Sequence, residues 1–136
     1  MTDVRARSDT PFRLFGTGSV GSQVLTGIPR LHNLRTDPFL DNKSVVWPFE
    51  TGWATDESWV GPDVRVVHAE IYPSVMEPPS DCIKDRGQVR AMWEWARDLD
   101  GQGELWKMFS IPTGIQAGSS DDILIRSEEG WILGVS

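Results

Sequence analysis

The sequence predicts a small α/β fold, with a sheet of two to four strands packed against two or three helices. Segments rich in β-branched residues alternate along the chain with segments in which apolar residues recur at helical spacing. At 136 residues, with 39% hydrophobic and 24% charged residues, the chain has the size and composition of one globular domain. We therefore expect a single α/β domain over residues 11–136, preceded by a flexible polar arm over residues 1–10.

The first expected helix follows a glycine-rich segment. A short apolar run at 12–15 leads into Gly16-Thr-Gly-Ser-Val-Gly21, and apolar residues then recur at helical spacing. We expect a helix over residues 19–27 and a further helical turn over 30–35, because Pro29 ends or kinks a helix.

Two strands are expected in the middle of the chain. Residues 43–49 are typical of a short strand, which Pro48 ends or confines to an edge of the sheet. Residues 50–62 combine acids, glycines and tryptophans, as in a loop. Residues 64–72 form the strongest strand of the sequence because they are rich in β-branched residues, and Pro73 closes it.

The second long helix is expected to begin at Asp85. Gln88 follows three residues later, as in a capping box, and Gly101 ends the pattern. One apolar stripe is expected to face the core, and it consists of Val89, Met92, Trp93, Ala96 and Leu99.

The remaining segments are shorter. Pro78-Pro79 requires an extended chain or a turn, and residues 104–109 suit a short helix. Residues 111–122 are rich in Gly, Ser and Pro and predict a loop. The apolar tail at 130–135 is expected to dock as a short strand.

Composition excludes several classes of protein. The net charge of −7 argues against a broad nonspecific grip on nucleic-acid phosphates. The single cysteine, Cys82, excludes an internal disulfide, and with two histidines it cannot form a structural zinc site of the usual spacing. No apolar run approaches the ~20 residues of a spanning helix, and the N-terminus lacks a signal-peptide pattern. We therefore expect a cytoplasmic protein with no membrane partner.

Gly16-x-Gly18-x-x-Gly21 matches the fingerprint of a dinucleotide-binding turn. The preceding run is short and contains Arg13, and no acid is placed at the end of a second strand. A glycine-rich helix entry selected for packing explains the same residues. Nucleotide binding through residues 16–21 is therefore the third of three functional hypotheses.

Acidic and other titratable side chains occur on the predicted strand and at the start of the predicted helix. Period-two alternation places Glu70 on one strand face with His68 and Tyr72. Lys84 and Asp85 begin the helix, where Asp85 suits a cap. A half-solvated strand and a capped helix explain these residues, and so does a site in which Glu70 and Asp85 converge on a divalent cation.

Several segments together resemble a known family. They are Leu14-Phe-Gly-Thr-Gly-Ser-Val-Gly-Ser-Gln-Val-Leu-Thr-Gly-Ile-Pro29, Val46-Trp-Pro-Phe-Glu-Thr-Gly52, Ala69-Glu-Ile-Tyr-Pro-Ser74, Lys84-Asp85 with Gln88-Val-Arg90, and Glu128-Glu-Gly-Trp-Ile-Leu-Gly134. The chain resembles the C-terminal half of an uncharacterised bacterial family of predicted nucleases with a ribonuclease H-like fold. Some members of that family carry a cobalamin-biosynthesis label.

The resemblance implies a partial ribonuclease H-like architecture and a metal-dependent nuclease site. Glu70 and Asp85 would be its catalytic, metal-binding acids, holding Mg²⁺ or Mn²⁺, with His68, Tyr72 and Lys84 as accessory residues. Longer members begin with a strand that supplies a further metal-binding aspartate, in a Val-Asp-Trp-Ser-like or Val-Asp-Gly-like motif. Nothing in residues 1–10 matches that motif.

Without this aspartate, the resemblance implies an incomplete or split nuclease. Such a chain would need a partner that carries the missing N-terminal half, or would form a homo-oligomer, and nucleic acid would be its substrate. The alternative from another class is a noncatalytic protein-interaction module, which would bind its partner through an open sheet edge and a Trp-rich surface.

Overall fold

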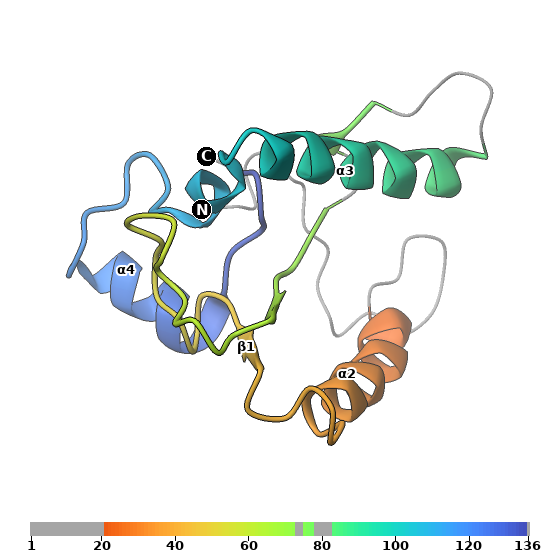
Figure 1. The fold of residues 1–136 in the computed structure, drawn as a ribbon, viewed down its shortest axis with the longest axis horizontal. Coiled ribbons are helices and arrows are strands. Elements are labelled where there is room, and N and C mark those ends of the chain that lie inside the picture. Colours follow the sequence, from red (N-terminus) through yellow and green to blue (C-terminus); the bar gives the residue numbers. More distant parts are fainter. Residues whose placement is uncertain (1–20, 73–74, 78–82, 136) are drawn as a thin grey trace. The chain divides into compact units, whose positions relative to one another are not determined.

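The computed structural model describes residues 21–72, 75–77 and 83–135 (Figure 1). It confirms a small α/β fold, with three α-helices and a two-stranded sheet in these residues. The elements are α2 (Gly21–Arg35), β1 (Ser44–Val46), β2 (Val66–His68), α3 (Lys84–Gly101), the 3₁₀-helix η2 (Leu105–Phe109), α4 (Ser120–Leu124) and the π-helix η3 (Ile125–Glu129). The ribonuclease H-like architecture stays a prediction.

Several predicted features lie outside the described residues. They are the arm at 1–10, the apolar run at 12–15, residues 16–20 of the glycine-rich motif, Pro78-Pro79 and Cys82.

Helix α2 is continuous where the sequence predicts a break at Pro29. A proline inside a helix has no N–H to donate, so α2 lacks one bond to the carbonyl of Leu25, four residues earlier. Leu25 is 65% exposed, so solvent can reach this part of the helix. The prediction of two separate helical segments is therefore wrong.

The two strands run parallel and are shorter than predicted. Arg65 donates its N–H to the carbonyl of Lys43 at 2.7 Å, and Trp47 donates to that of His68 at 2.9 Å. Strand β1 ends at Val46 because Glu50 closes a turn there. The Glu50 carboxylate accepts the N–H of Val46 at 2.7 Å, and the Glu50 N–H donates to the Val46 carbonyl at 2.8 Å.

Beyond β2 the chain pairs with a different segment. Glu70 forms an isolated parallel bridge with Ile132, and Leu133 donates its N–H to the Glu70 carbonyl at 2.9 Å. The predicted strand at 64–72 is thus three paired residues followed by one bridge. The predicted strand at 130–135 contributes only that bridge, because the chain turns at Gly134, whose φ is 81°.

Contacts within the described residues divide them into two units. One contains residues up to Val45 together with Asp63–Val67, and the other contains Val46–Pro62 and the residues from His68 on. In the first unit, Arg35 at the end of α2 donates to the carbonyl of Ser44 at 2.6 Å and so ties the helix to β1. Two compact units can belong to one domain or to two, so the single domain over residues 11–136 stays a prediction.

The apolar core of the second unit surrounds Trp47, which is 2% exposed. The Trp47 ring meets Trp53 and Phe109 edge-to-face, with ring centroids 5.6 and 5.5 Å apart. The Trp47 indole N–H donates to the carbonyl of Phe109 at 3.1 Å. The other buried apolar residues in the described part of this unit are Pro48, Ala54, Met92, Pro112, Ile115, Ile125, Trp131, Ile132 and Leu133.

Helix α3 begins one residue earlier than predicted, and the side that it buries differs from the predicted apolar stripe. Ile83 occupies the N-cap position without a side-chain cap, so Asp85 lies inside the first turn and the predicted capping box is wrong. The buried positions are Gly87, Gln88 and Met92. Val89 and Trp93, predicted to be in the core, are 56% and 58% exposed.

The segments after α3 contain η2, where the sequence predicts a helix, and α4 and η3, where it predicts none. The helix expected at 104–109 is the 3₁₀-helix η2. The predicted loop at 111–122 is too long, because α4 already begins at Ser120. Ser119 caps that helix, accepting the N–H of Asp122 on its side chain at 3.2 Å. Helix α4 then runs into η3, which ends at Gly130.

Gly130 adopts φ 74° and ψ −174°, a conformation that essentially only glycine tolerates. A Cβ on Gly130 would also lie 3.0 Å from Cζ of Phe49. We expect Gly130→Ala to lower the free energy of unfolding by about 1–3 kcal/mol, measured by urea denaturation. Gly61→Ala is the control because a Cβ there meets nothing within 4 Å. An equal loss of stability in both variants would show that neither the backbone conformation of Gly130 nor its closeness to Phe49 is responsible.

Candidate functional site

Glu70 lies at the bridge to Ile132 with an exposed side chain. Protein atoms crowd part of its carboxyl group, and this desolvation raises the pKa of Glu70. Within residues 21–72, 75–77 and 83–135, no side chain forms a hydrogen bond or ion pair with its carboxylate. The ionised form of Glu70 is therefore less favourable here than in a fully solvated side chain.

The predicted accessory residues His68 and Tyr72 are both partly buried. His68 ends β2, and its Nε2 atom is buried with no hydrogen-bond partner among the described groups. The Tyr72 carbonyl accepts the N–H of Val75 at 3.0 Å in a turn. No hydrogen bond between described groups joins either side chain to Glu70.

Lys84 and Asp85 lie exposed at the start of α3. Asp85 lines a surface pocket whose other described lining residues are Arg86, Val89, Arg90 and Trp93, all from α3. Glu70 is not among them. The described part of the chain contains no group of three or more His, Cys, Asp or Glu residues that could hold a metal ion. A metal site formed by Glu70 and Asp85 therefore stays a prediction.

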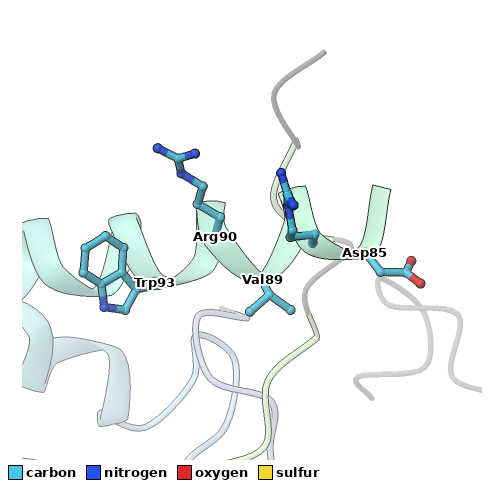
Figure 2. Close-up of a pocket in the computed structure, with 5 residues that line it drawn as sticks. Asp85, Val89, Arg90 and Trp93 are labelled. Atoms are coloured by element: carbon cyan, nitrogen blue, oxygen red, sulfur yellow. The ribbon is translucent and has the colours of Figure 1, made fainter. Parts of the chain in front are cut away.

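The most distinctive surface feature of the second unit is one face of α3, which we call the α3 outer face. It consists of Arg86, Val89, Arg90, Trp93 and Arg97. At about 100° per residue, the other four members lie within about 60° of Trp93 around the helix axis, whereas the buried Met92 lies about 100° away. Figure 2 shows Val89 and Trp93 along α3 with Arg90 between them and Asp85 at the helix start.

One arginine contacts the exposed indole of this face. The guanidinium carbon of Arg97 lies 4.8 Å from the ring centroid of Trp93, as in a cation–π contact. Arg97 also pairs with Asp98 at 2.7 Å, and Arg90 pairs with Glu94 at 3.0 Å. All four of these charged side chains are well exposed, so their pairing contributes little to stability. Chemically, the face offers apolar contact and positive charge.

A second polar cluster is built around Asp122, which is 2% exposed. Its carboxylate accepts hydrogen bonds at 2.7 Å from Nε of Arg126, from the N–H of Gly118 and from the indole N–H of Trp53. The bonds from Arg126, Gly118 and Trp53, in that order of effect, lower the pKa of Asp122 to about 2. A carboxylate this well satisfied connects structural elements and is a poor proton acceptor.

Sequence reasoning missed both the α3 outer face and the Asp122 cluster. The arginines at 86, 90 and 97 share one side of the helix with Trp93, and this pattern indicates a solvent-facing side. Ser119 followed three residues later by Asp122 is the pattern of a helix N-terminus. No family model, curated protein or solved structure matches the chain.

Asp122 should make stability depend on acid pH. Its pKa is about 2 in the folded protein against an ordinary 3.8, so the folded state binds this proton more weakly than the unfolded chain. The stabilisation is complete above pH 4 and is lost as the pH falls toward 2. We expect the free energy of unfolding, followed by urea denaturation, to fall across this window less steeply in Asp122→Asn.

Asp121→Asn is the matched control for this experiment, because Asp121 neighbours Asp122 on α4 and is exposed. We expect this variant to keep the wild-type slope between pH 4 and pH 2. A wild-type slope in Asp122→Asn would show that its hydrogen bonds do not hold the carboxylate in its charged form.

Proposed function

We propose that the chain is a noncatalytic protein-interaction module that binds a partner protein through the α3 outer face. The observation that carries this proposal is the position of Trp93. Its indole lies 58% exposed among arginines on the side of α3 away from the core.

The composition of the α3 outer face is that of a protein-binding site. Trp and Arg are enriched among the residues that dominate binding energy at protein interfaces. Val89 lies one turn from Trp93, so the two side chains give a partner a continuous apolar contact. Arg86 and Arg90 add positive charge along the same stretch of helix. More than half of the surface of Val89 and of Trp93 is open to a partner.

The metal-dependent nuclease implied by the family resemblance is the second candidate. It requires Glu70 and Asp85 to share Mg²⁺ or Mn²⁺ in a complex completed by a second copy or by a partner chain that carries the missing N-terminal half. The raised pKa of Glu70 suits this candidate, because a bound cation would offset the cost of the negative charge. Nucleic acid would then be the substrate.

A cytoplasmic location is part of both proposals and rests on the single cysteine in the sequence. Among the described residues, no helix combines the length and apolar character needed to cross a membrane.

Photo-crosslinking tests the interaction module. A photoreactive phenylalanine analogue at position 89 should crosslink to one defined protein in the cells of origin, and Trp93→Ala should reduce the yield about tenfold, as for a residue that dominates an interface. The analogue at Phe39 is the control, because Phe39 is exposed but lies far from α3 in sequence and in the other unit. Identical products from both positions would contradict the proposal.

Manganese titration tests the nuclease. If Glu70 and Asp85 share a metal, Mn²⁺ should raise the unfolding temperature of the wild-type chain, and Glu70→Gln should abolish the rise. Without metal, Glu70→Gln should be more stable than the wild type at pH 7, because a raised pKa disfavours the charged form, and the difference should shrink as the pH falls and Glu70 becomes protonated. An unchanged unfolding temperature with Mn²⁺ and no cleavage of DNA or RNA would exclude a metal site in the chain alone.

A further inference from the structure

We infer that the α3 outer face binds an acidic peptide segment with an apolar or aromatic anchor residue. This inference rests on the proposed interaction function and names the chemistry of the partner. Val89 and Trp93 would take the anchor, and the arginines would take its carboxylates.

Charge complementarity selects acidic residues for the partner. Three arginines lie on this face of a chain whose net charge is −7. Among the described residues, no carboxylate pairs with Arg86. The pair of Arg97 with Asp98 is exposed and weak, so a carboxylate of a partner can replace Asp98 at little cost. A guanidinium group also binds a carboxylate with two parallel hydrogen bonds.

The spacing of the face limits the length and direction of the segment. At about 1.5 Å per residue, the Arg86 and Arg97 backbone positions are about 16 Å apart. A helical segment of about three turns or an extended segment of about five residues covers this distance. Asp85 lies at the N-terminal end of the face and the exposed Asp100 lies beyond its C-terminal end, and each would repel an acidic residue there. The carboxylates of the segment should therefore lie over Arg86, Arg90 and Arg97.

Nucleic acid is the competing polyanion, because exposed aromatic and basic residues also stack bases and contact phosphates. The net charge of −7 repels a long polyanion more than it repels a short segment with two or three carboxylates. The face also contains only one aromatic residue, so it lacks the series of stacking positions that a single strand uses.

Selection from a phage-displayed library of random linear peptides on the wild-type chain tests the inference. We expect the enriched peptides to combine two or more Asp or Glu with an aromatic residue or Leu. Synthetic versions should bind about tenfold more weakly to Trp93→Ala and also to Arg86→Glu, as expected for residues central to an interface. Phe39→Ser and Arg65→Glu are the matched controls, because both residues are exposed and lie in the first unit.

The other outcomes separate the two proposals. Peptides that lack acids, depend on Trp93 and ignore Arg86→Glu would overturn the acidic partner and leave the interaction face in place. Peptides whose binding ignores Trp93→Ala would overturn both proposals. Tighter binding of a single-stranded oligothymidylate than of any selected peptide, lost in Trp93→Ala, would make nucleic acid the occupant. Circular dichroism should show the same helix content in every variant, because all the substituted side chains are exposed.

Discussion

The second unit depends on the burial of Trp47. Its indole N–H reaches the carbonyl of Phe109, 62 residues further along the chain, and the same carbonyl accepts the N–H of Ala54 at 2.9 Å. One buried oxygen thus joins the end of η2 to both sides of the turn after β1. Because an unsatisfied buried N–H or carbonyl is costly, these bonds determine where the segments lie as well as stabilising them. The rings of Trp53 and Phe109 then close around the indole.

Three of the segments that carry the family resemblance meet in this core. Gly130 of the C-terminal segment packs against the ring of Phe49 from the segment at 46–52, and Leu133 bonds to Glu70 from the segment at 69–74. Packing and backbone pairing therefore account for the positions of these residues in the second unit. The same reasoning does not extend to the carboxyl group of Glu70, one of the two acids of the predicted metal site. Backbone pairing accounts for the position of Glu70, but nothing in its described surroundings explains why this residue is an acid.

Much of the fold could be predicted from the sequence, but less of the candidate site. Helix α3 and the α/β class follow from local patterns, and β1 and β2 lie inside the predicted strands. The short lengths of these strands cannot be predicted from the sequence, because pairing depends on which distant segment lies alongside. The chain after β2 pairs with another segment, through the bridge of Glu70 with Ile132. The apolar residues of α3 fit two overlapping stripes, and only the tertiary contacts select the one with Met92 and expose Trp93. Helix α4 was missed because the glycine-rich stretch before Ser119 obscured its capping pattern.

The bridge between Glu70 and Ile132 also has a consequence for synthesis on the ribosome. Trp131, Ile132 and Leu133 are each at most 8% exposed and fill the core beside segments made long before them. Glu70 therefore leaves the ribosome well before Ile132 and Leu133, with which its backbone pairs. The second unit completes its core only after residue 133 has emerged, so part of its apolar surface stays open to chaperones until then.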